Sequence, residues 1–337
     1  MKYHTDIAII GAGPAGLFSA FEAGMLKMKC HVIDTLDSIG GQCIALYPEK
    51  PIYDIPAHPC ISAKELIKKL EEQAAPFNPT YHLGQQVVEL IRQKDRSFII
   101  ITSKNNKIHA KAVIIAAGCG AFGPNRPPVE GIEKFENKSI FYAVKNSNDF
   151  AEKNVVIAGG GDSAVDWAIV LADIAKSVTI VHRRSKFRCA PENSDKLHDL
   201  SKKGKIVIET PYQLHKIHGQ NGIMHSIEII DFDNNIKTLE ADILLPFFGL
   251  SMDLGPILNW QLVLNNKHIK VDSATLQTNV PGVFAVGDIV TYPGKLKLIL
   301  TGFSEAAVAC HSIYPIIYPD QALHFEYSTT KGITADG

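Results

Sequence analysis

One segment near the start of the chain has the residue types and spacing that hold a nucleotide pyrophosphate. Gly11, Gly13 and Gly16 follow the apolar run 6–10 in G-x-G-x-x-G spacing, and an apolar helix is expected to start there. Such glycines permit a tight turn, close approach of the backbone to the phosphates and close helix–strand packing. The loop residues Pro14 and Ala15 complete the predicted contacts.

A second segment repeats this unit in the middle of the chain. Residues 154–158 form a short apolar run, and Gly159, Gly161 and Ala164 follow in G-x-G-x-x-A spacing. A helix is expected over 163–175, and Asp162 and Ser163 at its start belong to the predicted contacts. The sequence therefore predicts two dinucleotide-binding units.

The two units differ where a dinucleotide-binding fold meets the adenosine ribose. In the first unit, the expected strand 30–33 ends at Asp34, whose carboxylate accepts hydrogen bonds from ribose hydroxyls. The corresponding position in the second unit is His182, and cations follow it: Arg183, Arg184, Lys186 and Arg188.

Exchange of an acid for cations indicates a phosphate ligand. Arginine binds phosphate with a planar, bidentate fork, so Arg183 and Arg184 are expected to hold the 2′-phosphate of NADP, with Arg188 and His182 nearby. The alternative is a solvated basic patch, as most charge runs are. The acid-bearing first unit is then expected to hold a different dinucleotide, and FAD is the partner that accepts hydride.

Composition excludes several classes of function. The chain has 337 residues, is 46% hydrophobic and 20% charged, and has a net charge of −1, so nothing draws it to nucleic acid or anionic membrane. The start of the chain reads as a strand entering a glycine loop and not as a signal peptide. Six scattered cysteines without a C-x-x-C pair predict no metal centre and a cytoplasmic location.

Three further segments carry a resemblance to a known family. These are GGQCIALYPEKPIYDIP after the first loop, VIIAAGCGAFGP at 113–124 and GVFAVGDIV at 282–290. With the two glycine loops they make the chain resemble the thioredoxin-reductase-like ferredoxin (flavodoxin)–NADP reductases of bacteria, which contain FAD. The resemblance covers nearly the whole chain.

The resemblance implies an α/β fold of two Rossmann-like, three-layer domains. Residues 1–120 and 280–337 would form a discontinuous FAD-binding domain, and residues 121–279 an inserted NADP-binding domain. Besides the first loop and Asp34, the implied FAD contacts are Gly41, Gln42, Tyr47, Val87, Phe122, Asp288 and Thr329.

One departure from thioredoxin reductases decides the expected chemistry. Those enzymes carry a C-x-x-C pair where this chain has Ala143, Val144, Lys145 and Asn146. The glutathione-reductase pattern, with two cysteines four residues apart, also fails, since only Cys43 is present. Dithiol exchange requires a thiolate pair. Electrons are therefore expected to leave the flavin outward and singly, to ferredoxin or flavodoxin.

The expected mechanism is hydride transfer from NADPH to N5 of FAD, with no side-chain acid or base. Tyr47 and, on the C-terminal tail, Tyr327 would stack on opposite flavin faces; His324 or Phe325 would replace Tyr327 if the register slips. A helix beginning near 298–301 would point its positive end at the flavin.

Other readings stay open. An NADPH-dependent reductase of quinones or small molecules, a non-catalytic FAD/NADP redox sensor and an assembly protein with vestigial loops would share the two glycine loops. The resemblance suggests a homodimer, and an acidic carrier would need basic docking residues, for which Lys145, Lys153 and Lys295 are candidates.

Overall fold

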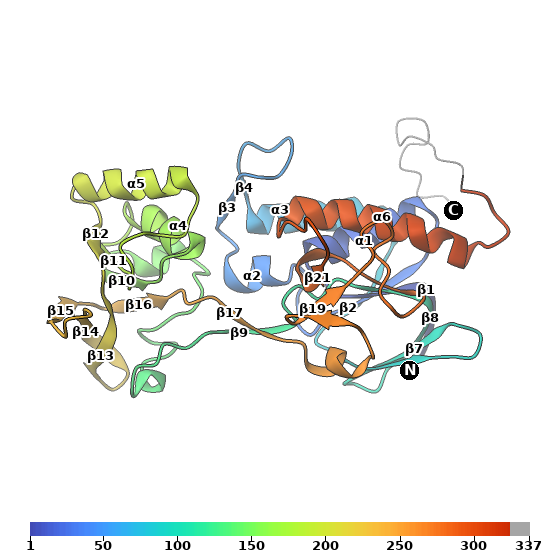
Figure 1. The fold of residues 1–337 in the computed structure, drawn as a ribbon, viewed down its shortest axis with the longest axis horizontal. Coiled ribbons are helices and arrows are strands. Elements are labelled where there is room, and N and C mark those ends of the chain that lie inside the picture. The colour runs from blue at the N-terminus through green and yellow to red at the C-terminus, as the bar shows by residue number, and fades with distance from the viewer. Residues whose placement is uncertain (324–337) are drawn as a thin grey trace. The chain divides into compact units, whose positions relative to one another are not determined.

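A computed structural model describes residues 1–323, without the side chains of Ala121, Phe122 and Leu250. The chain divides into two compact units (Figure 1). The first unit comprises Met1–Phe122 and the chain from Met252 onward, and the second unit comprises Gly123–Ser251. The chain passes between the units in β9 (Ala121–Pro124) and β17 (Leu250–Asp253), which pair with each other.

The second boundary differs from the expected one at 279/280, since residues 252–279 belong to the first unit. Pairing and packing give the reason. The hairpin of β18 (Leu264–Asn265) and β19 (His268–Lys270) is joined to β21 (Val290–Thr291) by parallel pairing. Leu276 packs into the core of the first unit. The Gly/Pro-rich segment near 280 is a turn inside this unit and not a linker.

The first unit is built on a sheet in the order β5-β2-β1-β8-β7-β6, with β20 also paired to β8. Ile7 and Ile9 are fully buried in β1, which lies in parallel between β2 and β8. The strands and short elements of this unit are β1 (Lys2–Ile10), β2 (Cys30–Ile33), β3 (Pro51–Ile52), β4 (Ile61–Ser62), η1 (Ala75–Phe77), β5 (Thr80–His82), β6 (Val87–Arg92), β7 (Phe98–Thr102), β8 (Lys107–Ile115), η4 (Gly255–Asn259), β20 (Val283–Ala285) and η5 (Gly287–Ile289).

Four helices complete the first unit: α1 (Pro14–Met25), α2 (Gln42–Leu46), α3 (Ala63–Ala74) and α6 (Ile299–Ile317). Helix α1 contacts both α3 and α6 (Figure 1). Helix α3 begins at a cap, where Ser62 Oγ accepts a hydrogen bond from the Glu65 amide at 3.2 Å. Leu66, Ile67 and Leu70 form its buried face, as their helical spacing requires.

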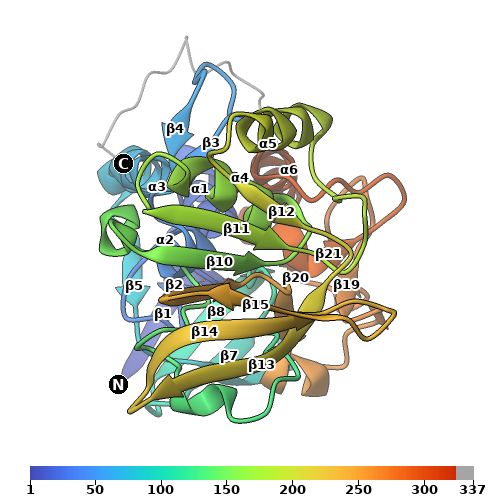
Figure 2. The same cartoon turned by 90° about the vertical axis from the view of Figure 1, so that its left-hand side faces the viewer.

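The second unit contains a smaller parallel sheet in the order β12-β11-β10-β16 (Figure 2). An antiparallel meander, β13-β14-β15, lies between β12 and β16 in the chain. The elements of the second unit are η2 (Ile132–Lys134), η3 (Ser147–Phe150), β10 (Asn154–Ala158), α4 (Asp162–Leu171), β11 (Ser177–Val181), α5 (Pro191–Lys202), β12 (Val207–Glu209), β13 (Gln213–Gln220), β14 (Ile223–Ile230), β15 (Ile236–Glu240) and β16 (Ile243–Pro246).

Each unit has its own hydrophobic core. The core of the second unit joins the parallel sheet to the meander, with Val156, Leu244 and Ile227 all at most 1% exposed.

Helix α4 ends at Leu171, four residues before the expected end. Within residues 1–323, no helix is both long and apolar enough to cross a membrane.

Candidate functional site

The loop between β1 and α1 shows why each of its glycines is needed. Gly11 has φ +112°, and a Cβ there would lie 2.3 Å from the Ala116 carbonyl oxygen. A Cβ on Gly16 would lie 1.9 Å from the Gly11 oxygen, so a side chain would separate the helix from the strand. A Cβ on Gly13 would meet nothing within 4 Å, so the backbone there borders open space. That is the arrangement of a loop that leaves room for phosphates.

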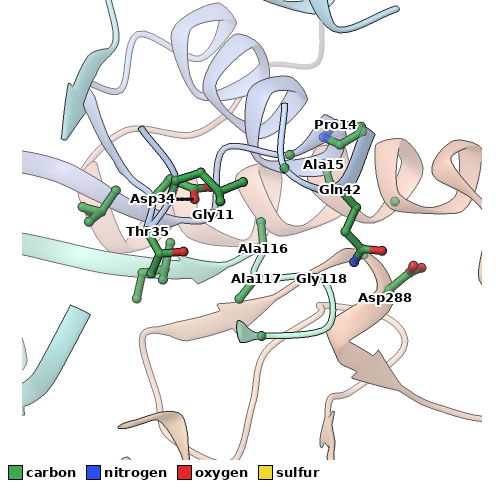
Figure 3. Close-up of a pocket in the computed structure, with 18 of the residues that line it drawn as sticks. Gly11, Pro14, Ala15, Asp34, Thr35, Gln42, Ala116, Ala117, Gly118 and Asp288 are labelled. Carbon is green, nitrogen blue, oxygen red and sulfur yellow. Dashed lines mark hydrogen bonds between the residues drawn. The ribbon is translucent and has the colours of Figure 1, made fainter. Parts of the chain in front are cut away.

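Asp34 lies directly after β2, next to this loop (Figure 3). Its Oδ2 accepts a hydrogen bond from the Ala12 amide at 2.6 Å, and its Oδ1 accepts one from the Leu36 amide at 2.8 Å. Burial raises the pKa of this carboxyl, and the backbone amides oppose that rise. The Thr35 hydroxyl also donates a hydrogen bond to this carboxyl and opposes the rise.

Gln42 and Asp288 lie at the end of the pocket away from Asp34 (Figure 3). Gln42 is the first residue of α2, after Gly41, which has φ +55°. A Cβ on Gly118 would lie 3.1 Å from the Gln42 side-chain nitrogen, so the loop after β8 also closes on this end. The structure thus brings together segments that are far apart in the sequence.

Tyr47 and Cys43 line the same pocket. The Cys43 thiol donates a weak hydrogen bond to the Tyr47 hydroxyl at 3.9 Å, and Lys50 Nζ lies 5.8 Å from the centre of the Tyr47 ring. Burial raises the pKa of Cys43 to about 11. Near neutral pH Cys43 is therefore a thiol and not the thiolate that dithiol exchange requires.

A buried ion pair supports the segment that carries Asp288. Glu305 of α6 accepts hydrogen bonds from the Gly287 amide at 2.7 Å, the Tyr292 hydroxyl at 2.6 Å and Lys295 Nζ at 2.5 Å. The side chains of Lys295 and Glu305 are 6% and 4% exposed. Lys295 is therefore not a docking residue, contrary to the sequence expectation. Sequence analysis missed Glu305, whose only signal is an acid within an apolar helix.

Helix α6 begins at Ile299, within the expected 298–301. Leu298, Ile299 and Gly302 line the pocket, and no side chain caps the first turn. Its unpaired amide groups and positive dipole end are therefore available to a group with partial negative charge.

All the residues that line the pocket belong to the first unit. Val87, one of the implied FAD contacts, lies in the wall of the pocket. Several other lining residues were not identified from the sequence, among them Thr35, Gln85, Gln86, Ile257, Trp260 and Lys297.

Some predicted contacts lie outside what the structure describes. These are the side chain of Phe122 and the tail residues Tyr327 and Thr329, together with the alternatives His324 and Phe325.

In the second unit, the loop between β10 and α4 repeats the pattern of open and closed glycines. A Cβ on Gly159, which has φ +156°, would lie 2.6 Å from the Phe247 oxygen, whereas one on Gly161 would meet nothing within 4 Å. Ala164 is fully buried where the helix packs. Asp162 Oδ1 accepts a hydrogen bond from the Ala190 amide at 3.0 Å and so fixes the segment after Arg188, while Ser163 is exposed.

His182 packs beneath this loop. A Cβ on Gly160 would lie 2.2 Å from its ring, and Phe187 stacks on it with ring centres 5.5 Å apart. Its Nε2 is buried and has no hydrogen-bond partner among the described residues. Burial and then Arg183 lower its pKa, so the ring is neutral near pH 7. It therefore does not add to the positive charge expected here.

The arginines lie at the edge of the same loop. The Arg188 amide donates a hydrogen bond to the Gly160 oxygen at 2.6 Å, which holds Arg188 beside the loop. Arg183, Arg184 and Arg188 are exposed, and within residues 1–323 none forms an ion pair with a carboxylate. An unpaired arginine cluster beside an open glycine loop is suited to binding a phosphate group.

Neither a dithiol nor a metal centre occurs in the described part of the chain. All six cysteines are free, and Ala143–Asn146 supply no thiol. No group of three or more potential ligands is placed to hold a metal ion in residues 1–323. Each unit instead carries an open glycine loop, with Asp34 beside the loop of the first unit and exposed arginines beside that of the second.

The sequence matches the model of the family called pyridine nucleotide-disulphide oxidoreductase over residues 5–309. The ferredoxin–NADP reductase of Rickettsia massiliae is 59% identical over 329 residues, which is 98% of both chains. That of Rickettsia prowazekii is 57% identical, again over 98% of both chains.

Solved structures give the same fold. The thioredoxin reductase of T. acidophilum matches with a TM-score of 0.81 and 25% identity, over 92% of this chain and 98% of its own. The Lactococcus lactis thioredoxin reductase, in its FR conformation, also matches with a TM-score of 0.81 and 25% identity, over 94% and 99%. Both comparisons span the two units.

Proposed function

The chain belongs to the pyridine nucleotide-disulphide oxidoreductase family, and we propose that it is an FAD-dependent ferredoxin–NADP reductase. It takes hydride from NADPH and passes electrons to a one-electron carrier. The observation that carries this proposal is the 59% identity, over 98% of the chain, to a protein with that name. The absence of a dithiol in the described part of the chain supports it, because electrons then need an external acceptor.

The residues of the first unit fit FAD. The open space at Gly13 accommodates a pyrophosphate, Asp34 accepts from the adenosine ribose, and Asp288 accepts from the ribityl chain. Gln42 and Tyr47 lie at the flavin end, and the amide groups at the start of α6 stabilise negative charge there. When bound, FAD accepts hydride and donates electrons singly.

The residues of the second unit bind the substrate NADPH. The open backbone at Gly161 admits its pyrophosphate, and Arg183, Arg184 and Arg188 hold its 2′-phosphate. The neutral His182 ring supports the loop from below and carries no charge to the phosphate. Because hydride transfer to a flavin needs no proton from the protein, the side chains bind and orient and do not act as acid or base.

Three finer points belong to the same proposal. Tyr47 stacks on one flavin face and Tyr327 on the other. The protein is a homodimer, as the family resemblance suggests. It is cytoplasmic, which the scattered free cysteines support. Flavodoxin serves as a carrier besides ferredoxin. The mass of the purified protein in solution tests the dimer directly.

The proposal is tested by NADPH-driven cytochrome c reduction with and without ferredoxin. We expect strong dependence on ferredoxin and poor activity with NADH. High rates with quinones that do not change when ferredoxin is added would instead indicate a quinone reductase. A single bleaching of the flavin without turnover on any acceptor would indicate a redox sensor.

A further inference from the structure

Two segments of the first unit contain no carboxylate. Residues 254–271 and 289–304 include no Asp or Glu, yet they carry Lys267, Lys270, Lys295 and Lys297. The whole chain has a net charge of −1, so this is a local excess of positive charge. Lys295 does not contribute, because its ammonium group is buried against Glu305.

The structure places the two segments side by side. β19 pairs in parallel with β21, with Ile269 opposite Val290 and Lys270 opposite Thr291 (Figure 1). Side chains alternate along a strand, so Lys270 lies on the same side as His268, while the fully buried Ile269 faces the core.

His268 joins Lys297 to this face. Its Nδ1 lies 2.8 Å from the Asn266 oxygen and its Nε2 lies 2.9 Å from Lys297 Nζ. The carbonyl requires a proton on Nδ1, so Nε2 accepts from the ammonium group and holds Lys297 in place. Lys297 also lines the pocket of the first unit, and so does the next residue, Leu298. The cations therefore extend to the rim of that pocket.

Apolar side chains are exposed among these cations. Leu296 is 60% exposed, Leu298 38% and Val263 48%, and the Val263 oxygen accepts a hydrogen bond from the Lys270 amide. Two carboxylates lie at the edges, Asp253 and Asp272, and each accepts a hydrogen bond from a nearby backbone amide. Apolar groups surrounded by charges of one sign are typical of a surface that docks a protein of opposite charge.

We propose that this basic face, formed by Lys267, Lys270 and Lys297 with Leu296, Leu298 and Val263, docks an acidic protein that carries single electrons. The inference rests on the proposed function and adds the surface through which electrons leave. Charge complementarity identifies the occupant, and the position of Lys297 and Leu298 in the pocket wall gives the reason for docking there. A carrier bound at the rim approaches the flavin end of the pocket without entering it.

The test compares Lys267→Gln/Lys270→Gln with the control Lys68→Gln/Lys69→Gln, which removes the same charge from the exposed side of α3. Neither variant alters a residue of the pocket wall. Ferredoxin-dependent cytochrome c reduction is measured at several salt concentrations, and NADPH oxidation is measured with a neutral quinone. We expect the KM for ferredoxin of the first variant to rise about 3- to 10-fold at low salt, with a weaker salt dependence and an unchanged rate with quinone.

An unchanged KM and salt dependence in the first variant would overturn the docking face while leaving the function in place. An equal rise of the KM in the control variant would also overturn the docking face. A change in the protein's mass in solution without a change in KM would overturn it too, and would assign the face to contact with a second copy of the chain. If wild-type turnover does not depend on ferredoxin, the proposed function fails and the inference with it. If the double variant loses activity with quinone, the single variant Lys270→Glu replaces it in the test, because the Lys270 side chain has no hydrogen bond among the described residues. The proposal then requires Lys270→Glu to raise the KM for ferredoxin without changing the rate with quinone.

Discussion

Gly13 and Gly16 lie three residues apart, yet a methyl group would meet different surroundings at each. Gly13 has an ordinary φ of −75° and open space at its Cβ position, whereas a Cβ on Gly16 would clash with backbone. We therefore expect Gly13→Ala to fold normally and to bind FAD about 10-fold or more weakly, because the methyl group occupies space needed by the phosphates. Gly16→Ala is expected to lose folded protein.

Fluorescence titration of the apoprotein with FAD, together with circular dichroism, distinguishes the two effects. Wild-type affinity in Gly13→Ala would contradict the placement of the pyrophosphate.

The arginines of the second unit are expected to act on NADPH alone. Loss of a charge-assisted hydrogen bond costs about 1.5–3 kcal/mol, so Arg183→Gln should raise the KM for NADPH roughly 10- to 150-fold. The KM for NADH, which lacks the 2′-phosphate, should stay within about twofold and serves as the control. Arg188→Gln should act in the same direction, since its backbone is bonded to Gly160. An equal loss with both nucleotides would contradict a phosphate-binding role.

Glu305 is expected to be essential to the stability of the first unit, because it neutralises the buried Lys295 ammonium group. Glu305→Gln leaves a buried ammonium group without its counter-charge, at a cost of about 3–5 kcal/mol. The temperature at which the flavin is released, followed by its fluorescence, should fall. Replacing both residues, Glu305→Gln with Lys295→Met, should restore part of the loss, since no unpaired charge remains. A double variant less stable than Glu305→Gln alone would refute this account.

At the scale of residues, the sequence predicts best those residues that belong to a motif of fixed spacing. Gly11, Gly16 and Asp34 could be identified because spacing along the chain fixes their geometry. The spacing marked His182 as the counterpart of Asp34, but its packing against Phe187 and Gly160 has no signature in spacing. Lys295 was mistaken for a surface cation because its partner, Glu305, lies on another element.

Among the elements, the edge pair β2–β5 contains a pH-sensitive contact. His31 Nδ1 lies 2.9 Å from His82 Nε2, so one proton is shared between the two rings. Burial, and then the charge of His82, lowers the pKa of His31 from 6.5 to about 4, and burial also lowers the pKa of His82. The unfolded chain therefore binds more protons than the folded chain between about pH 4 and 6.5, and the stability of the fold falls as pH falls through that range.

The temperature of flavin release, measured from pH 7 to pH 4.5, tests this. The wild type should lose more stability on acidification than His31→Gln, because the variant lacks the side chain whose pKa is lowered by folding. Flavin release reports on this pair because Asp34 follows β2 and its amide donates a hydrogen bond to the His82 oxygen. The exposed His198→Gln serves as the control. Identical pH dependence in wild type and His31→Gln would contradict the contribution of the pair.

Strands and helices with strong local patterns could be predicted well. The expected strands 30–33 and 154–158 agree with β2 and β10, and the helix expected to begin near 298–301 begins at Ile299. The early end of α4 at Leu171 could not, because residues 172–175 retain helix-forming composition and the turn that replaces them depends on the tertiary fold.

For the whole molecule, the family resemblance implied the insertion of one dinucleotide unit into another. The exact return point could not be predicted in this way, because residues 252–279 join the first unit through pairing of β19 with β21, which lies beyond them in the chain. Local composition near 280, rich in Gly and Pro, resembles a linker, although only long-range pairing decides the boundary.

The central claim is that electrons from NADPH leave the protein singly and without passing through thiols. The most direct measurement mixes NADPH-reduced protein anaerobically with oxidised ferredoxin and follows the absorbance of the flavin and of ferredoxin in a stopped-flow instrument. We predict that the flavin is reoxidised while two ferredoxin molecules are reduced per flavin, and that prior alkylation of accessible thiols leaves the rate unchanged. A flavin that stays reduced with ferredoxin, or a transfer abolished by alkylation, would contradict the account.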